Sequence, residues 1–136
     1  MDNKAIAKHF YEKIVSENLL SEVSQYISEN LVLNFDGKIV PVGLEGMKEH
    51  LVVVRKTYPD YTMKITRQFA ESDYVISEFV MTGTHGGEWL GIKPTHKKIS
   101  ISGINIDKIV DGKIVEHSGV ANTFEALWEN GLIKAN

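Results

Sequence analysis

The sequence predicts an α+β protein whose helices pack on one side of a strongly curved antiparallel sheet. Apolar residues recur every three or four positions in two stretches before Pro59, which is the period of an amphipathic helix. After Pro59 they alternate with polar residues, which is the period of a strand. Helices followed by a run of strands are typical of this class, and such a bent sheet would leave a cavity open at one end.

Helical segments come first. The opening helix begins after Asp2 or Asn3, either of which can cap it, and runs for about four turns with apolar positions at a spacing of four: Ile6, Phe10 and Ile14. Ser21 can begin a second, shorter helix, and residues 31–35 form a short strand that an Asp-Gly pair ends.

The next helix lies between Gly43 and Pro59. Its apolar positions keep the helical rhythm over almost four turns: Leu44, Met47, Leu51, Val54 and Tyr58. Pro59 ends it because proline lacks the N–H that a helix interior requires.

Four strands follow, over residues 61–69, 74–84, 98–110 and 113–121. The second of these is apolar on both faces, which predicts that both faces are covered. Asp111 and Gly112 join the last two strands as the pair that favours a tight primed turn. A short helix over 123–130 ends at Gly131, where a left-handed residue is favoured.

Size and composition exclude several classes of function. The 136 residues are expected to form a single domain, 1–136. The absence of cysteine excludes disulfides, zinc–thiolate sites and thiol nucleophiles. A net charge of −3 with scattered Lys and Arg argues against nucleic acid as a partner. With neither a signal-like N-terminus nor a long apolar run, we expect a cytoplasmic protein without membrane contact.

The last strand carries the polar cluster that suggests a site. Glu116, Ser118, Val120 and Asn122 share one face of a strand, and His117 lies on the other. The first row either lines a wet cavity or faces solvent. If it lines a cavity, burial would raise the pKa of Glu116 and make it a candidate acid or base.

Two more residues are catalytic candidates. Glu78 lies in mid-strand between apolar neighbours, which is costly unless it is paired, for example with Arg67, or functional. His85 ends a strand before a glycine-rich loop in which Trp89 is either an aromatic lid over an apolar ligand or a residue packed on the sheet. The histidines have no recognisable metal-ligand spacing, and no cofactor fingerprint is present.

Asn122 has two readings that do not exclude each other. Its amide could donate to a ligand carbonyl, or it could cap the last helix in an Asn-x-x-Glu box with Glu125. The remaining candidate ligand-binding residues are Ser118, His117, Trp89, Asn105, Asn34 and Phe10.

Three segments carry a family resemblance. They are Thr82-Gly83-Thr84-His85 with Gly87 and Gly91, then Gly103-Ile104-x-Ile106, and the run from Asp111 to His117. With the opening helix around Phe10, they make the chain similar to SnoaL-like polyketide cyclases, or ester cyclases, of the nuclear transport factor 2-like superfamily. The resemblance extends from this helix to Gly131.

The resemblance implies an α+β cone of the cystatin-like kind around an apolar pocket, usually dimerised through the outer face of the sheet. It also implies cofactor-free aldol chemistry with an acidic residue as general acid/base. The family's tail, Glu-His-Trp-Gly-Val-Val-Asp-Thr, reads Glu-His-Ser-Gly-Val-Ala-Asn-Thr over 116–123. Ser118 replaces the tryptophan and Asn122 the aspartate, and an amide cannot exchange a proton near neutral pH.

Three hypotheses for function follow. The first is a cofactor-free cyclase, isomerase or lyase acting on a small apolar carbonyl compound, with Glu78, Glu116 or His85 as base and Asn122 polarising the carbonyl. The second is a non-catalytic module of the same fold that binds a small apolar molecule. The third is a dimeric interaction protein that uses the outer face of the sheet.

Overall fold

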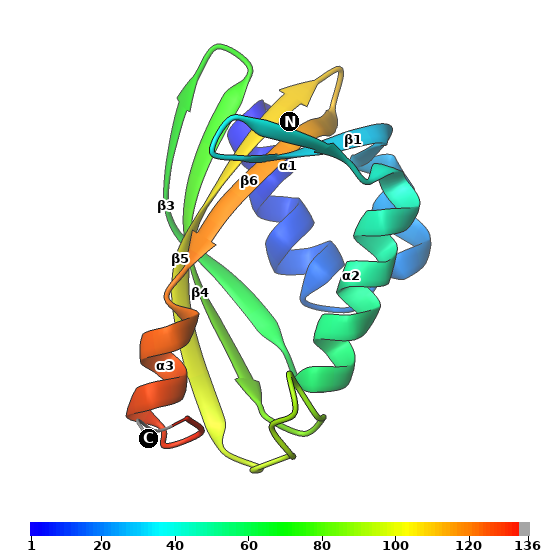
Figure 1. Ribbon diagram of the computed structural model, residues 1–136. Helices are drawn as coiled ribbons and strands as arrows, with labels where there is room; N and C mark the ends of the chain where they lie inside the picture. Colours follow the sequence, from blue (N-terminus) through cyan, green and yellow to red (C-terminus); the bar gives the residue numbers. More distant parts are fainter. Residues whose placement is uncertain (134–136) are drawn as a thin grey trace.

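The computed structural model describes residues 1–133 and confirms the α+β class (Figure 1). The helical elements are α1 (Asn3–His9), the π-helical turn η1 (Phe10–Val15), the 3-10 segment η2 (Leu20–Gln25), α2 (Gly43–Thr57) and α3 (Thr123–Glu129). The strands are β1 (Ile27–Phe35), β2 (Lys38–Pro41), β3 (Thr62–Glu71), β4 (Tyr74–Thr84), β5 (Lys98–Val110) and β6 (Lys113–Ala121).

One curved sheet of six strands runs in the order β2-β1-β6-β5-β4-β3. Figure 1 shows α1 and α2 on its concave side and α3 at the end of β6. All neighbours pair antiparallel except β1 and β6, which are parallel. The expected antiparallel sheet is therefore confirmed except for this one parallel pair. β1 arrives from the helical layer and not through a hairpin from β6, so the direction of that pair is not constrained by a turn.

The opening helix differs from the regular helix expected. The Asp2 carboxylate caps it as predicted and accepts the N–H of Ala5 at 2.8 Å. From Phe10 to Val15, however, the backbone is π-helical, and the Ser16 N–H donates to the Tyr11 carbonyl at 3.2 Å. The wider turn changes which side chains face the sheet, and π-turns occur often at functional sites.

The first strand and the edge of the sheet also differ from expectation. β1 begins at residue 27, four residues earlier than the short strand expected over 31–35. The strand β2 was not expected. It pairs with β1 after the Asp36-Gly37 turn and forms the edge.

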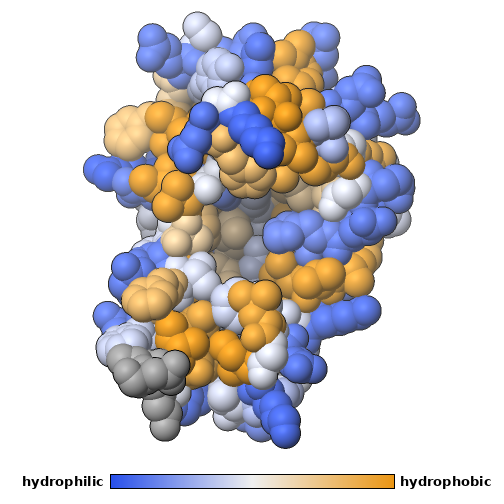
Figure 2. Space-filling view, viewed as in Figure 1, coloured by the Kyte–Doolittle hydropathy of each residue, from blue (hydrophilic) through white to orange (hydrophobic). Residues whose placement is uncertain are grey.

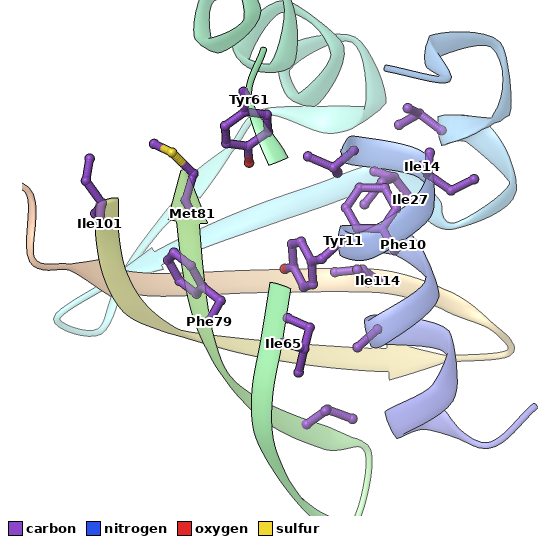
Figure 3. Close-up of a cluster of buried hydrophobic side chains, with 14 of the residues drawn as sticks. Phe10, Tyr11, Ile14, Ile27, Tyr61, Ile65, Phe79, Met81, Ile101 and Ile114 are labelled. Carbon is purple, nitrogen blue, oxygen red and sulfur yellow. The ribbon is translucent and has the colours of Figure 1, made fainter. Parts of the chain in front are cut away.

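The core lies between the helices and the concave face of the sheet (Figure 3). Phe10 and Ile14 from the helical layer contact a floor of strand residues, among which Ile27, Ile114 and Ile65 are buried. Each such side chain stabilises the fold by roughly 1.5–3 kcal/mol on burial. This packing fixes the helical layer over the sheet.

The β5–β6 hairpin contains the predicted turn and a bulge that was not predicted. Asp111 and Gly112 both have positive φ, 50° and 79°, as a primed turn requires. A few residues later the register shifts: Ile109 pairs with Ile114, but Lys108 pairs with Glu116. The extra residue, Val115, reverses which side chains of β6 face inward from that point.

Across the described residues, 1–133, no helix combines the length and apolar character needed to span a membrane. The single-domain organisation and the cytoplasmic location stay predictions.

Candidate functional site

A cavity of about 510 Å³ lies between β1, the strands β5 and β6, and α2. Figure 2 shows the molecule hollowed between the sheet and this helix. Its apolar lining includes Leu33, Val42, Met47, Phe79 and Ala121. Three polar side chains also line it: His50, Asn105 and His117. A mostly apolar wall with a few polar groups is typical of small-molecule sites.

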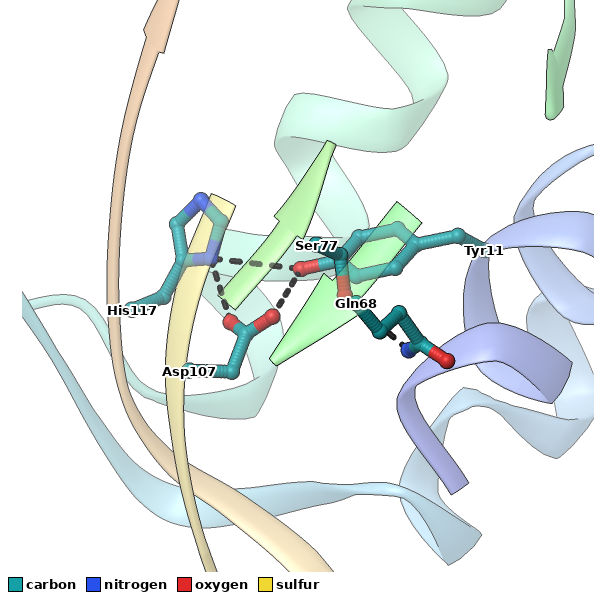
Figure 4. Close-up of polar contacts among 5 residues, drawn as sticks. All are labelled: Tyr11, Gln68, Ser77, Asp107 and His117. Atoms are coloured by element: carbon teal, nitrogen blue, oxygen red, sulfur yellow. Dashed lines mark hydrogen bonds and ion pairs between the residues drawn. The ribbon is translucent and has the colours of Figure 1, made fainter. Parts of the chain in front are cut away.

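A hydrogen-bonded array stands behind one wall of the cavity (Figure 4). His117 Nδ1 lies 2.6 Å from Asp107 Oδ1, and the Tyr11 hydroxyl donates to Asp107 Oδ2 at 2.6 Å. The Tyr11 oxygen is also 3.3 Å from His117 Nδ1. The array therefore joins three elements that are far apart in the sequence.

Each residue of the array is positioned by the strand or helical turn that carries it. Asp107 and His117 are directly opposite each other in the β5–β6 ladder, and the π-helical turn directs Tyr11 at the carboxylate. Asp107 is fully buried, whereas His117 keeps 21% of its side chain exposed. A buried carboxylate is tolerated only when its oxygens are paired, and here each oxygen has a partner.

The array determines where the protons lie. An ionised carboxylate can only accept hydrogen bonds, so Asp107 favours the His117 tautomer that carries its proton on Nδ1. In the neutral ring Nε2, which points away from the carboxylate in Figure 4, then has the free lone pair. Burial, followed by the charge and hydrogen bond of Asp107, raises the pKa of Tyr11 well above its usual value. Tyr11 therefore stays a donor.

The space beside His117 is kept open by a glycine. A Cβ at Gly119 would lie 2.7 Å from Asn105 Oδ1 and 3.7 Å from His117 Nε2. Any larger residue would displace the Asn105 amide. Among the described residues the Asn105 side chain makes no hydrogen bond, although the residue is only 7% exposed. Its amide is free to bind a ligand.

Of the two possibilities that the sequence left open for the row of Glu116, Ser118 and Asn122, the structure favours the outward-facing one. His117 lines the cavity and Ser118 lines a groove on the outer face with Ile104 and Ile106, while Gly119 and Val120 border both spaces. Glu116 belongs to this outer row and pairs with Lys108 in the ladder. The bulge at Val115 is the reason, because one extra residue exchanges the two faces.

Two further candidates lie away from the cavity. Glu78 forms an ion pair with Arg67 on the outer face, which is the partner that the sequence suggested as the alternative to catalysis. The hydrogen bond and charge of Arg67 lower the pKa of Glu78. Asn122 is exposed beside Glu125 in an outer groove. It occupies the N-cap position of α3, but its side chain makes no capping hydrogen bond.

The other predicted site residues are dispersed. His85 is buried below the loop after β4, with Nδ1 3.1 Å from Thr95 Oγ1, and Trp89 in that loop packs against the core. Phe10 is a core residue. Asn34 accepts the Gly37 N–H at 2.9 Å in the β1–β2 turn. Of the candidate residues named from the sequence, the structure brings Asn105 and His117 together in the cavity, and their binding role stays a prediction.

Sequence reasoning missed Asp107, Tyr11 and His50. Asp107 had a detectable signal, because it lies on the same face of its strand as Ile99, Ile101 and Ile109. A carboxylate therefore stands in a mostly apolar, inward-facing row. Tyr11 gave no such signal because its direction depends on the π-helical turn. Within the described chain, no set of three His, Asp or Glu side chains is arranged to hold a metal ion.

The profile of the SnoaL-like polyketide cyclase family matches residues 5–129. The chain belongs to this family. Solved structures named as polyketide cyclases share the fold seen here. A comparison with curated proteins found no match.

Three solved structures illustrate the likeness. IdmH of Streptomyces antibioticus, named as a candidate polyketide cyclase, is 22% identical over 96% of this chain and 99% of its own, with a TM-score of 0.84. AclR of Streptomyces galilaeus, named as a candidate hydroxylase, is 26% identical over 97% of each chain, with a TM-score of 0.83. A candidate polyketide cyclase of Acidithiobacillus ferrooxidans is 21% identical over 93% and 92%, with a TM-score of 0.81. The nuclear transport factor 2-like fold is thereby confirmed.

Proposed function

We propose that this SnoaL-like protein binds a small, mostly apolar carbonyl compound in the cavity and acts on it by cofactor-free acid/base chemistry. The observation that carries the proposal is the His117–Asp107–Tyr11 array opening onto an apolar cavity. A histidine oriented by a buried carboxylate is a recurrent arrangement for proton transfer. His117 takes the place in this proposal that the sequence assigned to Glu78, Glu116 or His85.

The proposed reaction begins with removal of a proton from the carbon next to the carbonyl group. His117 Nε2 accepts this proton, and the electron pair moves to the carbonyl oxygen to form an enolate. Asp107 stabilises the imidazolium through Nδ1–H, and the Asn105 amide donates to the oxygen on which negative charge develops. In a cyclisation the enolate carbon then attacks a second carbonyl carbon of the same molecule, and the imidazolium gives its proton to the resulting alkoxide. In an isomerisation the imidazolium instead protonates a different carbon of the conjugated enolate. Either route returns His117 to its neutral form without a cofactor.

Exchange of α-hydrogens tests this step without knowledge of the natural substrate. The probe is 2-tetralone, an apolar ketone with acidic α-hydrogens, incubated with the protein in D₂O and followed by NMR. We expect the wild-type protein to accelerate exchange over buffer, and His117→Gln and Asp107→Asn to abolish most of the acceleration. Glu116→Gln is the matched control, because it changes the neighbouring residue on the outer face and should leave exchange unchanged. Equal exchange by wild type and His117→Gln would disprove the assignment.

A second function, a non-catalytic binding module, is favoured by one observation. No carboxylate is among the described residues that line the cavity, and the aspartate of the family's tail is Asn122. This alternative predicts that 2-tetralone binds without exchange of its α-hydrogens. Chemical-shift changes in the protein that are not accompanied by deuterium incorporation would select it.

We also propose that the protein forms a homodimer through the outer face of the sheet. This face exposes a row of large apolar side chains: Phe69, Tyr74, Ile76, Ile104 and Ile106. A contiguous exposed apolar surface of this kind marks an interaction site, and a second copy of the chain offers the same surface by two-fold symmetry.

Light scattering coupled to gel filtration tests the dimer. We expect the wild-type mass to be twice 15.3 kDa, and the double variant Ile104→Lys/Ile106→Lys to elute as a monomer. Val53→Lys introduces the same charge at an exposed apolar position of α2 and should leave the dimer intact. A monomeric wild type at micromolar concentration would contradict the proposal.

A further inference from the structure

The cavity contains a second imidazole. His50 projects from α2 on the wall formed by this helix, while His117 projects from β6 on the wall formed by the sheet. His50 reaches solvent, whereas His117 is more deeply placed, with its Nδ1 bound to Asp107. His50 therefore marks the rim of the cavity, and His117 marks its inner end.

The cavity lining contains few titratable side chains. Among the described residues that line the cavity, none is Asp, Glu, Lys or Arg, so the imidazoles are its titratable groups. The negative charge of Asp107 lies behind His117 and is taken up by two hydrogen bonds, from His117 and Tyr11. Partial desolvation of His50 by the surrounding protein lowers its pKa, and the charge of His117 lowers it further. A negatively charged group beside His50 would offset both effects.

We propose that the ligand carries a carboxylate at the end nearest the opening, and that His50 binds this carboxylate. The inference rests on the proposed function, because it assumes that the apolar body of the ligand occupies the cavity. It adds the substrate class, an apolar keto acid or related acid, and the residue that recognises its acidic end.

Three physical points support this class of ligand. An imidazole N–H donates to a carboxylate in either charge state of the ring. At the rim the carboxylate keeps part of its hydration, so its transfer into the site avoids the large cost of burying a charge completely. With the carboxylate at the rim, the apolar body lies along Leu33, Met47 and Phe79, and the carbonyl group reaches His117.

Binding of a matched pair of probes at pH 7 tests the inference. The probes are 4-phenylbutyrate and the uncharged 4-phenylbutanamide, and calorimetry measures their dissociation constants. We expect the wild-type protein to prefer the carboxylate, and His50→Gln to weaken its binding about fivefold, as loss of a well-placed hydrogen bond to a partly exposed carboxylate would. The amide should bind both proteins equally.

Two further variants make the result specific. His50→Glu places a negative charge at the same position and should weaken carboxylate binding more than His50→Gln does, without effect on the amide. His96→Asn replaces an exposed histidine of the loop between β4 and β5 and should leave both constants unchanged.

The possible failures are distinguishable. Equal affinity of the wild type for the two probes, or an unchanged constant in both His50 variants, would overturn the carboxylate inference alone. If neither probe binds to the wild type, the proposal that the cavity takes small apolar ligands fails with it.

Discussion

Removing the Tyr11 hydroxyl should destabilise the protein measurably. In Tyr11→Phe the ring still fills its place in the core, but Asp107 Oδ2 loses the donor at 2.6 Å. Asp107 is fully buried, so water cannot replace the hydroxyl. A hydrogen bond to a buried charged group contributes about 1.5–3 kcal/mol, and we expect a loss of about 2 kcal/mol in the free energy of unfolding.

The corresponding change in thermal midpoint follows from chain length. At about 2.1 cal/mol/K per residue, 136 residues give an unfolding entropy of about 0.29 kcal/mol/K. A loss of 2 kcal/mol therefore lowers the midpoint by about 7 °C. Differential scanning calorimetry and urea denaturation at pH 7 measure the two quantities independently.

Tyr26→Phe is the matched control. Tyr26 is also partly covered by the core, but its hydroxyl makes no hydrogen bond among the described residues. Its replacement should change the free energy of unfolding by less than about 0.5 kcal/mol. If Tyr11→Phe is no more destabilising than Tyr26→Phe, the hydroxyl does not support the carboxylate and the array as described is incorrect.

Three other outcomes are expected. Burial raises the pKa of Tyr11, Tyr58 and Tyr61 above the usual value of 10, to about 12 for Tyr61. Their contribution to stability is therefore complete below pH 10 and is lost as pH rises through the folded-state pKa values. Absorbance at 295 nm should detect the late ionisation of the three side chains. Arg55→Met removes guanidinium hydrogen bonds to four backbone carbonyls, two of them at the end of η1. It should lower the free energy of unfolding, measured in urea, by about 2 kcal/mol. A change near zero would show that water replaces these hydrogen bonds. Glu78→Gln should leave the exchange of 2-tetralone unchanged, because Glu78 is paired with Arg67 on the outer face, away from the cavity; loss of exchange would return Glu78 to the catalytic candidates.

Part of the site could be expected from the sequence and part could not. His117 and Asn105 were named as ligand-binding candidates from the sequence, and the structure places both in the cavity lining. The sequence left open whether the row of Glu116 and Ser118 faces a cavity or solvent, because alternation gives two rows but not their directions. The bulge at Val115 reverses those directions, and no local propensity distinguishes it from a regular strand.

The sequence by itself determined the class of fold, most element boundaries and the turn at Asp111-Gly112, because these depend on short-range periodicity and backbone preference. The tertiary structure alone decided the parallel pairing of β1 with β6, the π-helical turn and the meeting of Tyr11, Asp107 and His117. Tyr11 and Asp107 are 96 residues apart. Their contact depends on packing of the helical layer against the sheet, and such long-range contacts leave no trace in a local pattern.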